Sequence, residues 1–167
     1  MRQDSEAVTV FLRPGSYFVG GAKYRVRTLL GSCVSVTLWH PARRMGAISH
    51  SLLPRRLDAT GECCGSDGRY CNEAVARMIE ELARAGVDAR ECEAKLFGGG
   101  HMFDGVPGYG RLGDVGRENG ECARREVLEQ GIRIVSESLF GAGHRELIFD
   151  IQSGDVWMRQ VEPARGA

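Results

Sequence analysis

Two short runs of alternating apolar residues, joined by a proline turn, constrain the fold of this chain most strongly. In CVSVTLW, residues 33–39, valine or leucine occupies every second position of the first six, which is the period of a β-strand with two different faces. After His40 and Pro41 a second run, MGAISHSLLP, reads as another strand that ends at Pro54. Because a loop of about five residues joins the two runs, we predict an antiparallel hairpin.

The rest of the chain alternates between strand and helix patterns. Apolar residues recur at a helical period after Asn72, the predicted N-cap, and the helix is expected to end at Gly86. A second helix is expected from about Asn119 to Gln130. Further strands are expected in AVTVFL, YRVRTLL, AKLF, IRIVS, ELIFDI and DVWMRQV. This order, with a hairpin near each end, predicts an α+β fold of packed mixed or antiparallel β-sheets flanked by helices.

Composition favours one domain over residues 1–167, because a chain of this length buries enough surface to fold without disulfides or metal. No apolar run approaches the roughly 20 residues that span a bilayer, and acidic residues precede the first apolar run. A cytoplasmic location without membrane insertion is therefore expected. Lys and Arg total 22, as do Asp and Glu, and this balance argues against nucleic-acid binding.

The six cysteines do not form a metal-binding pattern. Cys63, Cys64 and Cys71 stand in CCGSDGRYC, which has neither the paired spacing of a zinc site nor a histidine nearby. We expect these three on the long loop over residues 55–71, beside the candidate site that is described next, whereas Cys92 and Cys122 are expected to pack as small apolar residues in or beside helices. FGGGHMFDG lacks the G-x-G-x-x-G spacing of a dinucleotide site. No metal and no cofactor is expected.

Cys33 and His50 are the strongest candidates for a catalytic pair. The predicted hairpin brings them together, because 50 − 33 = 17 residues suit two strands of about six or seven residues and a short turn. A thiol becomes a nucleophile when an imidazole within hydrogen-bond reach takes its proton. The alternative interpretation is a packed cysteine and a structural histidine, because free cysteine is among the most buried residue types.

Glycines accompany this pair. Gly31 and Ser32 lead into Cys33, and glycine lets the backbone approach a ligand closely. Backbone N–H groups after such a turn are suited to stabilise an oxyanion. The predicted substrate cleft and oxyanion site therefore comprises Gly31, Ser32, Gly98, Gly99 and Gly100, with His101 at its border.

Several motifs occur in a fixed order along the chain. TLLGSCVSVTLWHPARRMGAISHSLLP is followed by RYCNEAV, EAKLFGGGHMF, DVGRENG and GAGHRELIFDIQSGDVWMR. This series resembles the CheD family of bacterial chemoreceptor glutamine deamidases, whose hallmark runs T-x-LGSCV, a short turn with Pro, and G-x-x-H-x-x-LP. The resemblance covers nearly the whole chain, roughly from Arg13 to Arg159.

The resemblance implies a protein-glutamine glutaminase with a cysteine-histidine-threonine triad, on a fold similar to the catalytic domain of cytotoxic necrotizing factor toxins. Carried over by position, Cys33 is the nucleophile, His50 is the base and Thr28 is the third member. The reaction passes through a thioester that water hydrolyses to glutamate. Thr37 is the structural competitor for the place of Thr28. The chain departs from the family pattern at Glu118, where arginine is common.

The implied substrates are specific glutamines of methyl-accepting chemotaxis receptors. An alternative role, also implied by the family, is that of a regulatory binding module that docks a CheC-type chemotaxis phosphatase. The presence of both Cys33 and His50 favours catalysis, because a docking module needs neither.

Overall fold

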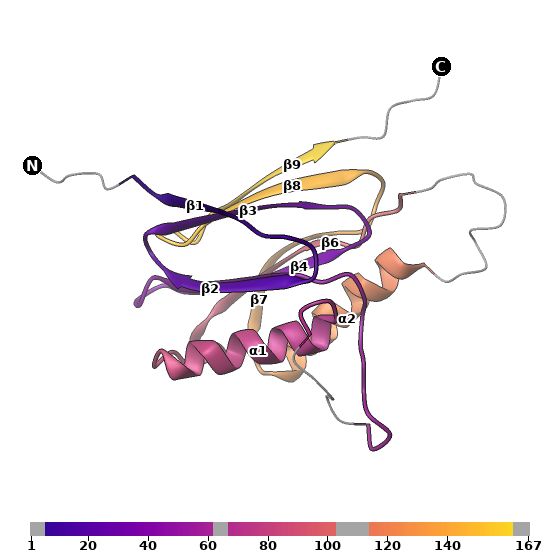
Figure 1. Cartoon of the computed structure of the whole chain (residues 1–167), viewed down its shortest axis with the longest axis horizontal. Coiled ribbons are helices and arrows are strands. Elements are labelled where there is room, and N and C mark those ends of the chain that lie inside the picture. The colour runs from indigo at the N-terminus through magenta and orange to yellow at the C-terminus, as the bar shows by residue number, and fades with distance from the viewer. Residues whose placement is uncertain (1–5, 62–66, 103–113, 162–167) are drawn as a thin grey trace, which may run out of the picture.

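The structure, a computed structural model, describes residues 6–61, 67–102 and 114–161, which form three layers (Figure 1). Two β-sheets lie face to face, and two helices cover the outer side of the larger sheet. The predicted α+β class with mixed sheets and flanking helices is confirmed. None of the described helices is long and apolar enough to cross a membrane.

The four-stranded sheet has the order β1-β3-β8-β9, with β1 parallel to β3 and the other neighbours antiparallel. Its strands are β1 (Val8–Phe11), β3 (Tyr24–Leu30), β8 (His144–Asp150) and β9 (Val156–Val161). Along β3, a strand that was predicted, the burial of the side chains alternates, because Val26, Thr28 and Leu30 are buried whereas Arg27 and Leu29 are exposed. The buried face of β3 therefore looks onto the other sheet.

The five-stranded sheet has the order β2-β5-β4-β6-β7. Its strands are β2 (Ser16–Gly21), β4 (Val34–His40), β5 (Met45–His50), β6 (Glu93–Gly98) and β7 (Arg133–Leu139). The predicted hairpin is confirmed, since β4 and β5 are antiparallel and Thr37 lies opposite Ile48. The sequence did not predict β2, because both of its faces are only half-buried and give no clear alternation.

The helices α1 (Cys71–Arg84) and α2 (Val115–Glu129) begin earlier than the sequence predicted. Asn72 is not the N-cap of α1, since its amide instead bonds both backbone groups of Arg56. The second helix starts at Val115 rather than near Asn119, because the Asp114 carboxylate accepts the Arg117 N–H and caps it. A short 3₁₀ helix, η1 (Ala89–Glu91), follows α1.

The hydrophobic core has two levels. Between the helices and the five-stranded sheet, the outer faces of β4 and β6 pack against α1 and α2. Between the sheets, smaller clusters include Ile48 with Phe149, and Leu30 with Phe97 and Leu147. The residues of β4 thus face the helices and the second sheet alternately, which explains their nearly complete burial.

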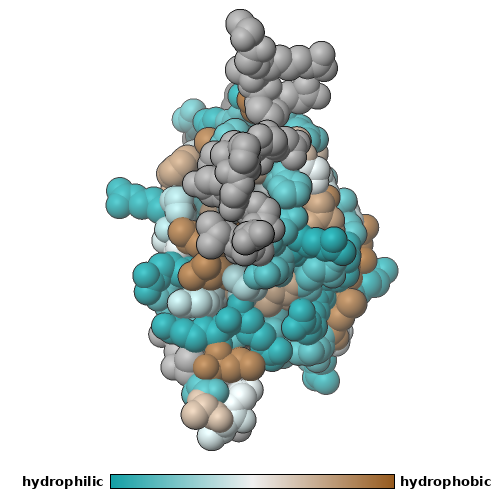
Figure 2. Space-filling model, turned by 90° about the vertical axis from the view of Figure 1, so that its right-hand side faces the viewer, coloured by the Kyte–Doolittle hydropathy of each residue, from teal (hydrophilic) through white to brown (hydrophobic). Residues whose placement is uncertain are grey.

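One end of the molecule gathers the termini of several elements. Since Val34 pairs with both Gly98 and Ser51, β5 and β6 end where β4 begins, and α2 begins at the same end (Figure 1). The described surface in the view toward this end is largely hydrophilic, with scattered hydrophobic side chains (Figure 2). Cys33 and His50 lie at this end, each next to the bridge between Val34 and Ser51.

Candidate active site

His50 and Thr28 form a buried pair that joins the two sheets. The Thr28 Oγ1 atom lies 2.7 Å from His50 Nδ1 and 2.9 Å from the carbonyl oxygen of Leu12. A carbonyl oxygen only accepts hydrogen bonds, so the single hydroxyl proton of Thr28 is donated to Leu12. Thr28 therefore accepts the Nδ1–H of His50, and in the neutral ring Nε2 carries the free lone pair. The imidazole is thus held in the tautomer of a general base.

Thr37, the structural competitor for the third position, is also buried but makes a different contact. Its hydroxyl donates to the carbonyl oxygen of Lys95 on β6, with a distance of 3.3 Å. Of the two threonines it is thus Thr28, on the opposite sheet, that the structure brings to His50.

The register of the hairpin places Cys33 next to the Thr28–His50 pair. Val34 and Ser51 exchange both backbone hydrogen bonds, at 3.0 and 2.9 Å. Since the strands are antiparallel, Cys33 and His50 are diagonal neighbours on the face that looks toward the four-stranded sheet. The Cα atoms of such a diagonal pair are about 7–8 Å apart and their Cβ atoms are somewhat closer, within reach of long side chains. The half-buried Cys33 also packs on Leu30, Phe97 and Leu147.

The loop that carries Cys33 is tied to the protein by three consecutive carbonyl groups. The carbonyl oxygen of Gly31 accepts the Gly100 N–H at 3.0 Å, and that of Cys33 accepts the Gly99 N–H at 2.8 Å. Between them, the Ser32 carbonyl accepts a side-chain N–H of Asn119 at 3.0 Å. Sequence patterns did not indicate this role of Asn119, although its place in the DVGRENG motif at a helix start was an available signal.

The glycines at 98–100 shape this loop by close backbone contact. A Cβ atom at Gly98 would overlap the carbonyl oxygen of Cys33, and one at Gly99 would lie 2.6 Å from the carbonyl oxygen of Gly116. The φ angles of Gly98 and Gly99 are +106° and +63°, in the region that favours glycine. Since the N–H groups of Gly99 and Gly100 already bond the loop, they support it rather than face an open cleft.

Burial shifts both titratable groups of the candidate pair toward their neutral forms. It lowers the pKa of His50 from 6.5 to about 4. Burial also raises the pKa of the Cys33 thiol, an effect that the backbone N–H of Cys33 partly offsets. At neutral pH the resting site therefore holds a thiol and a neutral imidazole rather than a preformed ion pair.

This shift makes the stability of the protein depend on pH. Because the pKa of His50 is lower in the folded protein, the unfolded chain binds the proton first, and stability is lost as the pH falls from about 6.5 to about 4. This lowering of the pKa of His50 corresponds to roughly 3 kcal/mol in the free energy of unfolding. Urea unfolding at several pH values measures it. His50→Gln should lack this part of the acid dependence, and an unchanged pH profile in that variant would contradict the shift.

The other cysteines and His101 lie outside the candidate pair. Cys71 was predicted on the loop but is the first residue of α1 and is fully buried, so that prediction is wrong. Cys63 and Cys64 lie outside the described residues. Cys92 and Cys122 are buried among apolar residues, as predicted. His101 is exposed and pairs with the Asp114 carboxylate at 3.1 Å.

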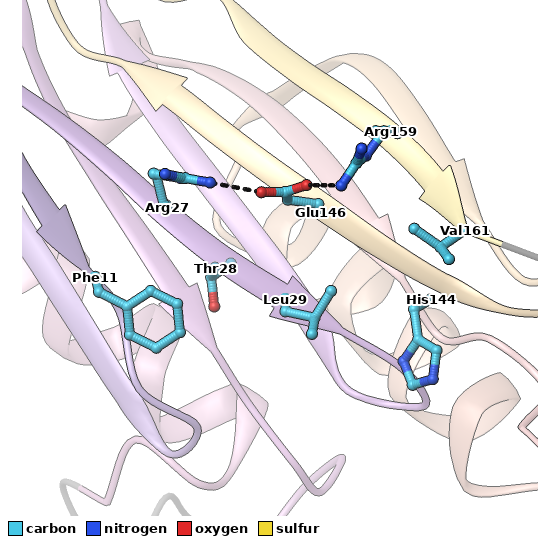
Figure 3. A pocket seen from close by; sticks show the side chains of 8 residues that line it. All are labelled: Phe11, Arg27, Thr28, Leu29, His144, Glu146, Arg159 and Val161. Atoms are coloured by element: carbon cyan, nitrogen blue, oxygen red, sulfur yellow. Dashed lines mark hydrogen bonds and ion pairs between the residues drawn. The ribbon is translucent and has the colours of Figure 1, made fainter.

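A groove of about 430 Å³ lies on the outer face of the four-stranded sheet (Figure 3). Phe11, Leu29 and Val161 supply apolar walls, and along one side the Glu146 carboxylate bonds Arg27 and Arg159, each at 2.7 Å (Figure 3). Thr28 also borders this groove, but its hydroxyl group is directed to His50 and Leu12. The groove and the Thr28–His50 pair thus share one residue of β3.

Comparisons with known proteins identify the family. The model of the family described as "CheD chemotactic sensory transduction" matches residues 52–160. A protein of Albidiferax ferrireducens named "Probable chemoreceptor glutamine deamidase CheD 2" is 50% identical over 163 residues, which cover 98% of this chain and 93% of that relative. A protein of similar name from Dechloromonas aromatica is 40% identical, over 92% of this chain and 88% of that relative. Another from Thermococcus kodakarensis is 39% identical, over 79% of this chain and 80% of that relative. The chain therefore belongs to the CheD family.

Proposed function

We propose that this protein deamidates specific glutamines of methyl-accepting chemotaxis receptors, with Cys33 as the nucleophile, His50 as the base and Thr28 as the group that orients the base. The buried Thr28–His50 hydrogen bond is the observation that carries this proposal, because it leaves Nε2 as the proton acceptor beside the hairpin position of Cys33. The names of the curated relatives supply the substrate class.

The first half of the reaction forms a thioester. The Cys33 sulfur attacks the carboxamide carbon of the glutamine while its proton passes to His50 Nε2. The C–N bond of the tetrahedral intermediate then breaks, and the imidazolium gives its proton to the departing nitrogen, which leaves as ammonia. Because the resting pair is neutral, the proton moves during the attack itself.

The second half returns the enzyme to its starting state. A water molecule attacks the thioester while His50 Nε2 takes one of its protons. The C–S bond then breaks, the sulfur recovers the proton from the imidazolium, and glutamate is released. Glutamine and water are thus converted to glutamate and ammonia.

The negative oxygen of each tetrahedral intermediate needs hydrogen-bond donors. Since the carbonyl groups of Gly31 and Ser32 are bonded into the protein, the trans geometry of their peptides turns the N–H groups of Ser32 and Cys33 the opposite way. The Cys33 N–H also acts on its own thiol, whose pKa it lowers. We assign these two N–H groups as the oxyanion donors, which narrows the predicted oxyanion site to the Gly31–Cys33 turn.

Replacement of Thr28 by valine is expected to lower kcat by about 10- to 100-fold, because His50 loses the acceptor that fixes its tautomer. Thr28→Ser keeps the hydroxyl and should restore most of the activity. Thr37→Val is the matched control, since it removes a buried hydroxyl that bonds Lys95 instead. Steady-state kinetics on receptor fragments measure the effect, and equal losses in both valine variants would contradict the role of Thr28.

Release of ammonia from receptor cytoplasmic fragments tests the proposed function. The purified protein is incubated with fragments of each receptor from its own cell, and ammonia is measured by a coupled enzymatic assay. We expect release from at least one receptor and none when its target glutamines are replaced by glutamate. Absence of ammonia with every receptor would refute the proposal.

The remaining expectations keep their status as predictions. Docking of a CheC-type phosphatase is the alternative role, and a buried, oriented histidine is not a feature that docking requires. Likeness of the fold to the cytotoxic necrotizing factor catalytic domain also stays a prediction, as does a single domain over residues 1–167.

A further inference from the structure

Asn119 connects α2 to both halves of the candidate site. Its side-chain nitrogen donates to the carbonyl oxygen of Ser32 at 3.0 Å and to that of Leu52 at 2.9 Å. Ser32 directly precedes Cys33, and Leu52 lies two residues beyond His50. One amide group thus joins the loop of the nucleophile to the chain that carries the base.

The orientation of this amide follows from its partners. Both partners are carbonyl oxygens, which accept only, so the NH₂ group must face them and it uses both of its hydrogens. The Asn119 side chain is completely buried, and its Oδ1 atom has no hydrogen-bond partner among the described residues. A buried acceptor without a partner is uncommon in folded proteins, and a role in catalysis is one explanation for such a group.

The bond to Ser32 controls the direction of the next N–H group. The Ser32 carbonyl and the Cys33 N–H belong to the same planar peptide and point in opposite directions. A carbonyl group held by Asn119 therefore turns the Cys33 N–H away from α2. Without that donor the flanking bonds of Gly31 and Cys33 remain, but the peptide between them can rotate.

The close fit of α2 against the glycines supports the same role. A Cβ atom at Gly116 would lie 2.5 Å from the carbonyl oxygen of Gly100, and Gly120 lies against the ring of Phe140. The first two turns of α2 therefore pack closely against the segment that supports the Cys33 loop. This packing fixes the distance between Asn119 and Ser32.

We propose that Asn119 is a positioning residue for deamidation: it holds the Ser32–Cys33 peptide so that the Cys33 N–H donates to the oxyanion, and it keeps this loop in register with the His50 strand. The inference rests on the proposed function for its chemistry. Both hydrogen bonds that Asn119 donates go to backbone carbonyl groups rather than to the sulfur or the imidazole, so it acts through the backbone that it holds.

Two kinds of measurement separate this role from simple stabilisation. Asn119→Ala should lower kcat by about 10- to 100-fold with KM changed by less than about threefold, because an oxyanion donor acts mainly in the transition state. Alkylation of Cys33 by iodoacetamide needs no oxyanion donor, so its rate should stay within about threefold of the wild type. Affinity for a glutamine-derived peptide aldehyde, which forms a tetrahedral adduct with the thiol, should fall in parallel with kcat.

Asn72→Ala is the matched control. Asn72 is also a buried asparagine with bonds to backbone groups, but it lies in α1 and contacts Arg56. This variant should lose stability without a loss of kcat. If Asn119→Ala does not fold, Asn119→Asp keeps the shape of the side chain, cannot donate two hydrogen bonds, and should show the same split between kcat and alkylation.

A crystal structure of Asn119→Ala, or of Asn119→Asp if the alanine variant does not fold, tests the inference without a measurement of deamidation. A rotated Ser32–Cys33 peptide supports the positioning role even if no receptor is deamidated, in which case only the proposed function has failed. An unchanged peptide, or kcat and alkylation reduced to the same degree, would overturn the inference.

Discussion

Replacement of Cys33 by alanine is expected to reduce deamidation on the order of 10⁴-fold or more, because in the proposed mechanism Cys33 supplies the sulfur of the thioester. Cys33→Ser should be almost as inactive, since a neutral imidazole with a pKa of about 4 is a weak base for an alcohol. Stability should change little, because Cys33 is only half-buried at the edge of a small cluster. Ammonia release and thermal unfolding measure the two properties.

Cys92→Ala is the control for this experiment. Cys92 is a buried thiol beside η1 and belongs to the core between the helices and the five-stranded sheet. Its removal should cost stability and leave kcat unchanged. Substantial deamidation by Cys33→Ala, or an equal loss of activity in the Cys92 variant, would exclude Cys33 as the nucleophile.

Replacement of His50 by glutamine is expected to lower kcat by about 10³-fold, because the thiol loses its proton acceptor and ammonia loses its proton donor. The rate at which iodoacetamide alkylates Cys33 at neutral pH should change by less than about threefold. The reason is that burial keeps both groups neutral at rest, so His50 does not hold a thiolate in the free protein. Kinetics and alkylation on the same preparation give both values.

His40→Gln is the matched control, because His40 is also buried in the hairpin but bonds Glu91 and the Arg43 N–H. This variant should retain wild-type kcat. A large fall in the alkylation rate of His50→Gln would instead mean that the resting site holds an ion pair, which contradicts the pKa directions. Retention of deamidation by His50→Gln would remove His50 from the reaction.

The alternation of apolar residues was sufficient to predict the hairpin, and the length of the hairpin was sufficient to predict that Cys33 and His50 lie near each other in the chain's fold. Period-two patterns carry this information directly, because a strand exposes different residues to its two faces. The alternation in YRVRTLL agrees with the structure, in which Thr28 lies on the buried face of β3. The contact between Thr28 and His50 could not be derived from it, since the two residues belong to different sheets and no local pattern encodes how sheets stack. The resemblance to the family supplied that pairing.

The places of Cys71, of Asn119 and of the glycines at 98–100 could not be predicted from the sequence, and the reasons are again physical. Cys71 looked like a loop residue because glycine and aspartate precede it, yet its side chain starts the buried face of α1. The role of Asn119 depends on carbonyl groups that lie 87 and 67 residues away in the chain. The glycines at 98–100 were predicted to help stabilise the oxyanion, but the N–H groups of two of them bond the Cys33 loop instead.

Mass spectrometry of a receptor fragment incubated in heavy-oxygen water tests the central claim most directly, because hydrolysis of a thioester places one solvent oxygen in each new glutamate. We expect the wild-type protein to convert a defined receptor glutamine into glutamate that carries the heavy oxygen, and Cys33→Ala to leave the same residue as glutamine. Conversion by Cys33→Ala at the wild-type rate, or no conversion by the wild type on any receptor of its cell, would contradict catalysis by Cys33.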